Sequence, residues 1–169
     1  MEIKSTLKSR LSGIVPVVYR DIESTEELGD RVVHGVHAFC FVGDELVIVY
    51  SDMKGYWTPP GGGVEPDETV EEAIVREVLE ETNMRVLKQH VIGYQEVSEP
   101  HRLTTQVHSV CIVEPIGPFV ADADPDDGGE GVTEIKLINP KDIKQYFDWG
   151  EVGEHVLARA LELKSILLD

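Results

Sequence analysis

A short acidic segment between Gly62 and Met84 constrains the fold of this chain more than any other part of the sequence. Thr69 and Glu72 have the spacing of a capping box, in which each side chain bonds to the backbone of the other residue, so they predict the start of a helix. This helix is expected to run through about Thr82. A loop rich in glycine and proline, GYWTPPGGGVEPDE, comes before it and is expected to lead directly into the helix start.

Three glutamates lie close together on this predicted helix. Successive helical residues rotate by about 100°, so Glu77, Glu80 and Glu81 fall within one arc of about 100°. Carboxylates held this close repel one another unless a cation joins them or one of them takes up a proton. Mg²⁺ and Mn²⁺ are the cations that such hard oxygen ligands favour. The opposite side of the helix is expected to face the core and carries Ile74, Val75, Val78 and Leu79.

Arg76 is the basic residue of this helix that is placed to reach the acidic side chains. It stands four residues from both Glu72 and Glu80, a separation that puts side chains on the same side of a helix. A charge-assisted hydrogen bond from its guanidinium would orient a ligand carboxylate and lower the pKa of that group. An acidic helix face is also a common form of solvated surface, so residue types alone leave both interpretations open.

The spacing of the whole segment favours the functional interpretation. From Gly62, five residues lead to Glu68, seven more lead to Arg76, and EVLEETNM follows. This resembles the Nudix box, G-x5-E-x7-R-E-U-x-E-E-x-G-U with U aliphatic, at every fixed position except one. The exception is Asn83, where the pattern has glycine, and asparagine is the next best residue for a left-handed helix end. The resemblance covers roughly residues 31 to 145 and includes, upstream of the box, Trp57, Pro60, Gly61 and Gly62.

The resemblance to the Nudix family implies an α/β fold, an α/β/α sandwich with a mixed β-sheet between helices. The chain length predicts a single domain over residues 1–169. Enzymes of this family hydrolyse a nucleoside diphosphate linked to another moiety, using Mg²⁺ and attack by water on phosphorus. Carried onto this chain, the resemblance makes Glu77 and Glu81 the leading metal ligands and Glu80 a further ligand or base. It also implies that the Gly62 carbonyl completes the metal shell, while Arg76 and Glu68 support the ligands.

Many family members add an acidic residue from a loop beyond the box, either as a metal ligand or as the general base. The long acidic segment from about Gly117 to Thr133 is the matching loop, since loops of this length inside a compact domain are often functional. Glu130 is the first choice in it, ahead of Asp127 and Glu134. The alternative is that this loop is merely solvated.

Substrate-binding residues are less sharply indicated. Pro100, about sixteen positions past the box, is a feature that resembles ADP-ribose pyrophosphatases, although a proline can also simply end a strand. Arg102 could meet a phosphate, and Tyr56 or Trp57 could stack on a base. Three histidines in predicted strands are expected to be core or sheet-face residues with satisfied hydrogen bonds, and these are His34, His37 and His108.

The remaining segments have the pattern of strands and one further helix. Residues 1–30 are expected to form an N-terminal extension with one strand, Ile14 to Tyr19. Gly43 and Asp44 separate two apolar runs between residues 32 and 50, which indicates a hairpin. Further strands are expected over Val86 to Val97, Leu103 to Val113 and Glu134 to Ile138, and an amphipathic helix over Val152 to Leu168.

Composition restricts the partners of this protein. Among 169 residues, 32 are acidic and 15 basic, which gives a formal net charge of -17 and a field that repels nucleic acid and anionic membranes. No apolar run approaches membrane-spanning length. The two cysteines, Cys40 and Cys111, lie in apolar runs and are expected to be free and buried. Location in the cytoplasm is therefore the default expectation.

The sequence thus predicts a metal-dependent hydrolase with a small-molecule nucleotide diphosphate as substrate: ADP-ribose, a nucleotide sugar or a nucleoside triphosphate. The alternative is a Nudix-like module that binds a nucleotide as a sensor without hydrolysing it, although the complete set of box carboxylates argues against this. A homodimer that exchanges the N-terminal strand is a further expectation.

Overall fold

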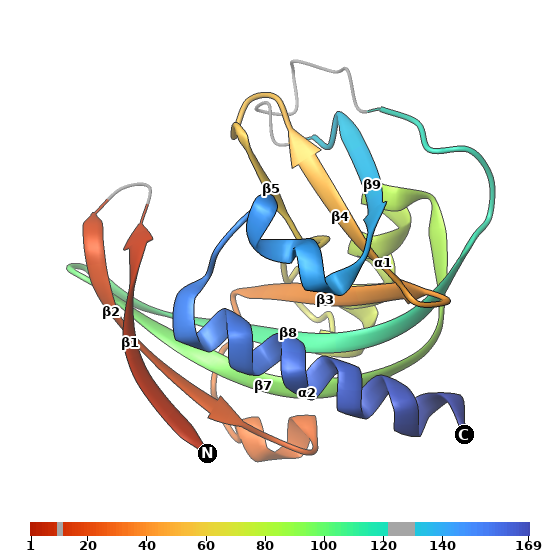
Figure 1. Ribbon diagram of the computed structural model, residues 1–169. Coiled ribbons are helices and arrows are strands. Elements are labelled where there is room, and N and C mark those ends of the chain that lie inside the picture. Colours follow the sequence, from red (N-terminus) through yellow and green to blue (C-terminus); the bar gives the residue numbers. More distant parts are fainter. Residues whose placement is uncertain (10–11, 122–130) are drawn as a thin grey trace.

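The computed structural model describes residues 1–9, 12–121 and 131–169, and their strands form a single mixed sheet (Figure 1). The strand order is β1-β2-β7-β8-β3-β4-β5, while β6 pairs with β3 and β9 pairs with β4. Strands β3 and β8 run parallel, and the other pairs are antiparallel. The strand bounds are β1 Glu2–Ser9, β2 Gly13–Asp21, β3 Gly35–Val42, β4 Glu45–Ser51, β5 Tyr56–Thr58, β6 Gly61–Gly63, β7 Met84–Glu99, β8 Arg102–Pro115 and β9 Glu134–Ile138.

Helices α1 (Val70–Thr82) and α2 (Gly150–Leu168) cover opposite faces of this sheet. Alternate residues of β3 show this directly, because side chains along a strand point to opposite faces. Val36 and Ala38 belong to the core cluster of α1, whereas Phe39 belongs to the core cluster of α2. The predicted α/β/α sandwich with a mixed sheet is confirmed. Two short 3-10 helices, η1 (Thr25–Leu28) and η3 (Pro140–Gln145), were not expected from the sequence.

Both ends of α1 agree with the sequence prediction. The Thr69 hydroxyl accepts a hydrogen bond from the Glu72 backbone N–H at 3.1 Å, and the Glu72 carboxylate accepts one from the Thr69 N–H at 3.2 Å. Asn83 ends the helix in the left-handed conformation, with φ 54° and ψ 39°. An asparagine therefore adopts the backbone conformation for which the family pattern uses glycine.

The prediction that Val75 and Leu79 face the core is wrong, since their exposed fractions are 44% and 45%. Contact with the sheet is made by a narrower stripe, in which Ala73, Ile74 and Val78 are completely buried. A helix of 13 residues on a twisted sheet buries one side only. In α1 this buried side lies between the side predicted to be apolar and the side predicted to be acidic.

The N-terminal extension forms a hairpin that belongs to the sheet. The expected strand at Ile14 to Tyr19 is confirmed as β2, but β1 was missed because its side chains are mostly exposed and Ile3 is its single buried residue. β2 pairs with β7 from Val17↔Val97 to Asp21↔Gly93. These pairings lie within one chain, and the homodimer stays a prediction.

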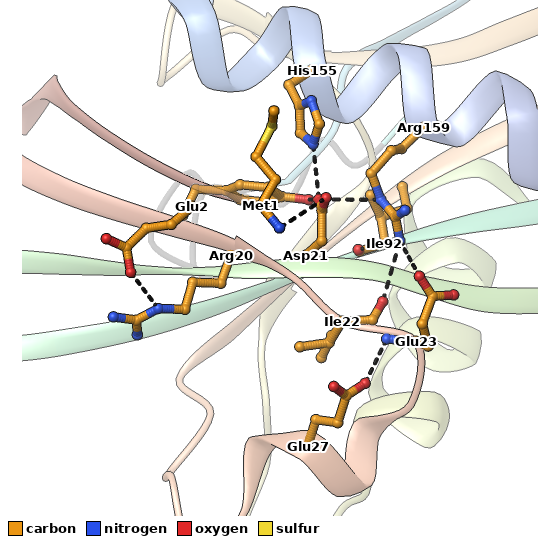
Figure 2. Close-up of polar contacts among 11 residues, drawn as sticks. Met1, Glu2, Arg20, Asp21, Ile22, Glu23, Glu27, Ile92, His155 and Arg159 are labelled. Atoms are coloured by element: carbon orange, nitrogen blue, oxygen red, sulfur yellow. Dashed lines mark hydrogen bonds and ion pairs between the residues drawn. The ribbon is translucent and has the colours of Figure 1, made fainter.

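A partly buried polar cluster fastens this hairpin to α2 (Figure 2). The Asp21 carboxylate accepts hydrogen bonds from the Tyr19 hydroxyl and from His155 Nε2, both at 2.9 Å. Arg159 Nε lies 3.2 Å from the same oxygen as an ion pair. Burial alone would raise the pKa of Asp21, but the bonds from His155 and Tyr19 and the charge of Arg159 together lower it.

Asp21→Ala is expected to lower the free energy of unfolding by about 2 kcal/mol, because it leaves the buried Tyr19 hydroxyl and the partly buried donors of His155 and Arg159 without their common acceptor. Denaturant unfolding at pH 7 measures this. Asp44→Ala is the control, since the Asp44 side chain is fully exposed where it pairs with Lys164 at 3.3 Å, so little change in the free energy of unfolding is expected. Equal losses in both variants would contradict a structural role for the cluster.

Other expectations are confirmed with changed bounds. The hairpin around Gly43 and the strands after α1 are present, and the final helix begins two residues earlier than expected. Cys40 and Cys111 are free, buried and paired in register on β3 and β8. No helix in the part of the chain that the structure describes is long and apolar enough to span a bilayer. Glu130 and Asp127 lie outside the described residues.

Candidate active site

Strand β6 brings bare backbone against the acidic side of α1. Gly61 pairs with His37 of β3, and a side chain at Gly61 would collide with the Val36 carbonyl oxygen. A Cβ atom on Gly62 would lie 2.5 Å from the Glu77 Oε1. Gly61 therefore lets β6 pack closely against β3, and Gly62 leaves room for the Glu77 carboxylate beside the main chain of the loop.

Arg76 holds the acidic residues in place. Its Nε and Nη2 donate to the two oxygens of Glu68, each at 2.8 Å, which is the bidentate arrangement that a guanidinium favours. Nη1 donates to Glu77 Oε1 at 2.8 Å and to Glu80 Oε2 at 3.3 Å, and Nη2 also donates to the Gly63 carbonyl at 2.8 Å. The expected contact with Glu80 is present, whereas Glu72 serves the helix cap. Arg76 therefore joins the loop to three glutamates.

Glu77, Glu80 and Glu81 differ in their surroundings. Glu77 and Glu81 turn toward the sheet and are partly buried, whereas the Glu80 side chain is 57% exposed. Burial raises the pKa of Glu77, an effect that Arg76 partly offsets. Burial also raises the pKa of Glu81 to about 8, with a further contribution from the nearby charge of Glu77 and an opposing one from the Gly61 N–H, which donates to Glu81 Oε1 at 2.7 Å. Without a cation, Glu81 is mainly protonated at pH 7.

A divalent cation beside this pair of carboxylates would favour their ionised forms. Glu77 and Glu81 occupy successive turns of α1, and a nearby cation relieves the desolvation that raises both pKa values. Within residues 1–9, 12–121 and 131–169, no three histidine, cysteine, aspartate or glutamate side chains are arranged to hold a metal ion. The described side chains therefore supply a site of two carboxylates beside a glycine backbone, with Glu80 at its exposed margin.

Gly62→Ala is expected to reduce turnover by about 100-fold, because the new methyl group displaces the Glu77 carboxylate and small displacements at a reacting centre are costly. Steady-state hydrolysis with Mg²⁺ measures this. Gly63→Ala is the matched control, since a Cβ there meets nothing closer than the His34 carbonyl at 3.8 Å. Equal activity of the two variants would show that the close approach at Gly62 is unimportant.

A cavity of about 690 Å³ lies on the opposite face of β3, the face that α2 covers. Tyr56 lines it, but Trp57 does not. The Trp57 ring packs instead against Tyr50 and Tyr146, with centroids 5.2 and 5.8 Å away. Arg102 is exposed at the start of β8 and is not among the lining residues either. The structure thus places these two predicted substrate residues away from the cavity.

Several residues of this region carry no signal in the sequence. Gln95, Gln106 and Trp149 line the cavity, although they are far apart in the chain. Lys54, in the turn between β4 and β5, is close enough for its charge to lower the pKa values of both Glu81 and His37. Only the folded sheet brings these residues together, so no spacing pattern could have found them.

The expectation of satisfied histidines holds for one of the three. His34 Nδ1 accepts a hydrogen bond from the Thr105 N–H at 3.0 Å. The expectation is wrong for His37 Nδ1 and for both ring nitrogens of His108, which are buried and have no hydrogen-bond partner among the described residues. Their rings stack 5.3 Å apart, and Trp149 packs against both. Burial lowers the pKa of His108, and lowers that of His37 to about 4, so both are neutral at pH 7.

The fold is a mixed sheet between two helices. In the site, a glycine strand faces a helix that carries two desolvated glutamates and a bridging arginine. Together these features define an α/β protein of the Nudix class. The NUDIX domain model matches residues 33–160, and the chain belongs to this family.

Curated relatives match a limited part of the chain. It is 33% identical to diphosphoinositol polyphosphate phosphohydrolase 3-alpha of Mus musculus over 72 residues. This aligned stretch makes up 42% of this chain and 44% of that protein. It is 35% identical over 78 residues to the NAD-capped RNA hydrolase NudC of Pseudomonas aeruginosa, which is 45% of this chain and 28% of that protein. The chain therefore aligns with less than half the length of these relatives.

Solved structures match more of the chain. The superposition with the Bacillus subtilis pyrophosphohydrolase BsRppH covers 94% of this chain and 96% of the BsRppH chain, with a TM-score of 0.69 and 19% identity. A MutT structure from a study of Aliivibrio salmonicida and Vibrio cholerae covers 78% of this chain and 98% of its own, with a TM-score of 0.54 and 24% identity. At these identities the likeness establishes the shared fold.

Proposed function

We propose that this protein is a metal-dependent hydrolase that cleaves a diphosphate bond in a nucleoside diphosphate linked to another moiety. The observation that carries the proposal is the desolvated pair Glu77 and Glu81, held against the glycine strand β6 by Arg76 and the Gly61 N–H. Membership of the NUDIX family supports it, as do relatives named as a diphosphoinositol polyphosphate phosphohydrolase and an NAD-capped RNA hydrolase.

Each residue of the site has a distinct part in this proposal. Glu77 and Glu81, with the Gly62 carbonyl, would hold Mg²⁺ or Mn²⁺, which neutralises the diphosphate and lowers the pKa of a water so that it can attack phosphorus. Arg76 orients Glu77 and partly offsets the effect of burial on its pKa. Glu80 is exposed next to this pair, so it is placed to act as a further ligand or to accept a proton from the attacking water.

The proposed substrate is a small nucleotide such as ADP-ribose, a nucleotide sugar or a nucleoside triphosphate. With a net charge of -17, the protein repels a polyanion such as RNA, while one diphosphate can be neutralised locally by a bound divalent cation. The two free buried cysteines suit a reducing compartment, so we propose that the protein acts in the cytoplasm.

The direct test is hydrolysis of these nucleotides with Mg²⁺, Mn²⁺ or EDTA, with products identified by mass. Metal-dependent cleavage that EDTA abolishes is expected. If nucleotides bind in calorimetry but no product forms over hours with either metal, the protein is a nucleotide sensor and the hydrolase proposal fails.

A further inference from the structure

Strand β1 (Glu2–Ser9) is an open edge of the sheet. It stands at one end of the strand order, and no strand in the described part of the chain pairs along its outer side (Figure 1). The strand at the other end, β5, has only three residues, whereas β1 has eight. A long unpaired edge offers a row of backbone donors and acceptors to a further strand. β1 is therefore able to accept one.

The ladder between β1 and β2 determines which backbone groups of β1 face outward. The register begins at Glu2↔Arg20, and one step before it the Asp21 N–H donates to the Met1 carbonyl at 3.1 Å. Hydrogen-bonded and non-hydrogen-bonded pairs alternate along an antiparallel ladder, so the odd-numbered residues of β1 bond to β2. Pro16, which has no N–H, lies opposite an even-numbered residue, in agreement with this alternation. The outward N–H and C=O groups belong to Glu2, Lys4, Thr6 and Lys8.

Two copies of β1 can pair with each other in three central registers. A symmetric dimer relates its subunits by a twofold axis, so the two strands run antiparallel and outward-facing residues lie opposite one another. The axis can then pass beside Lys4, Ser5 or Thr6. In the first register the two copies of Lys4 lie opposite each other, and in the third Lys4 lies opposite the partner's Lys8. Like charges directly opposite destabilise strand pairing, so both of these registers are disfavoured.

The register centred on Ser5 places complementary side chains together. Glu2 lies opposite the partner's Lys8, and symmetry makes this contact occur twice. Ile3 lies opposite the partner's Leu7, and both belong to the side of β1 that is buried or partly buried in each subunit. Opposite-charge and apolar cross-strand pairs both stabilise a ladder. β1 is thus complementary to itself in one register.

The charge of β1 differs from that of the protein as a whole. Two copies with a net charge of -17 each repel one another. β1 carries two lysines and one glutamate, and this Glu2 already forms an ion pair with Arg20 of β2 at 2.7 Å. Approach through this edge therefore brings cationic side chains to the contact, in contrast to the acidic surface elsewhere.

We propose that two copies of this protein associate through β1, in the antiparallel register centred on Ser5, and form one sheet that runs through both subunits. Each β1 keeps its own β2, so this association differs from an exchange of N-terminal strands. A contact of one strand per subunit is smaller than a standard interface, so we expect a dissociation constant of about 1–100 µM. The contact needs neither a metal ion nor a nucleotide.

Sedimentation velocity over about 1 to 300 µM protein tests the association, in EDTA and without nucleotide. We expect the 18.8 kDa chain to reach twice this mass as the concentration rises. A chain that stays monomeric over the whole range would overturn the proposal, whatever its hydrolytic activity.

Thr6→Pro removes an outward N–H without removing a bond to β2. Proline is tolerated on edge strands for this reason, and circular dichroism and the melting temperature check the fold. We expect the dissociation constant to rise at least about tenfold, because the dimer loses the hydrogen bond of this N–H in both subunits. Thr6→Val is the matched control, since it keeps the N–H and should dimerise like the wild type. A dimer of wild-type affinity in Thr6→Pro would overturn edge pairing and indicate exchanged strands.

Single cysteines identify the register in the folded protein. Ser5→Cys places two thiols across the axis at the spacing of a non-hydrogen-bonded pair, about 4.5 Å between Cα atoms, which a disulfide can bridge. We expect oxidised glutathione to cross-link Ser5→Cys as a dimer, but not Thr6→Cys or the wild type, whose own cysteines are buried. Failure of Ser5→Cys to cross-link, or equal cross-linking of Thr6→Cys, would overturn the register.

Lys8→Glu tests the charge pairing. It places a glutamate opposite Glu2 at two points of the dimer, so we expect the dissociation constant to rise about tenfold or more. Lys141→Glu is the matched control, because Lys141 is exposed on η3 and its replacement changes the net charge by the same amount. Equal weakening by both variants would show that net charge governs the association and would overturn the pairing of Glu2 with Lys8.

Discussion

Glu81→Gln is expected to abolish metal-dependent hydrolysis, by a factor of about 10³ or more, and at the same time to stabilise the metal-free protein above pH 7. The loss of turnover follows because an amide carries no charge to hold a divalent cation. The gain in stability follows because Glu81 is a buried carboxyl group whose pKa rises from its ordinary value of 4.5 to about 8 in the folded protein. A neutral side chain removes the cost of ionising that group.

The sign of the pH effect comes from the protons bound in each state. Between pH 4.5 and pH 8 the folded protein keeps a proton on Glu81 that the unfolded chain has released. Raising the pH through this range therefore lowers the free energy of unfolding, and it does so only in the absence of a cation. In Glu81→Gln this component of the pH dependence disappears.

Denaturant unfolding in EDTA at pH 5.5 and pH 8.5 measures the effect. We expect the wild-type protein to lose several kcal/mol more than Glu81→Gln between these two pH values, and Mg²⁺ to restore stability to the wild type alone. Glu80→Gln is the control, because the Glu80 side chain is 57% exposed and its charge is only a minor cause of the raised pKa of Glu81, so most of the wild-type pH dependence should remain. Identical pH dependence in wild type and Glu81→Gln would show that the burial of Glu81 has no energetic effect.

Arg76→Ala is expected to reduce kcat/KM by at least about 100-fold and to lower the free energy of unfolding by about 2 kcal/mol. The variant removes the donors that hold Glu68, Glu77 and Glu80. It also leaves the partly buried Glu77 without the positive charge of the guanidinium. The pKa of Glu77, already raised by burial, should rise further. Its proton then competes with the metal.

Arg76→Lys separates charge from geometry. Lysine keeps the positive charge but cannot form the bidentate bond to Glu68 together with the bond to Glu77. We expect it to recover most of the stability and little of the activity. Arg85→Ala is the control, because Arg85 pairs with Glu114 on the surface and its side chain is 62% exposed. Full activity in Arg76→Lys would show that charge alone suffices.

The sequence by itself determined the features that depend on local interactions. The capping box at Thr69, the helix end at Asn83 and the spacing from Gly62 to Glu81 involve neighbours within a few turns, so a linear pattern records them. The strands after α1 were also predictable, because their richness in Val, Ile, Thr and Tyr is a property of short segments.

The tertiary structure alone decided which of the acidic residues are desolvated. Helical periodicity placed Glu77, Glu80 and Glu81 on one arc, but contact with β6 buries two of them and leaves Glu80 exposed. The same contact moves the buried stripe of α1 away from Val75 and Leu79. These outcomes depend on the angle at which a helix meets a sheet, which no local pattern contains.

The cavity, likewise, exists only because distant segments meet. Leu7, Gln95, Gln106 and Trp149 are separated by up to most of the chain, and strand pairing places them around one space. The pKa of His37 falls because neighbouring elements exclude water from its ring, although the residue itself looks like any strand histidine in the sequence. The local pattern thus determined the family and its acidic helix, whereas long-range packing decided the burial, protonation and shape of the site, because desolvation depends on everything that surrounds a side chain.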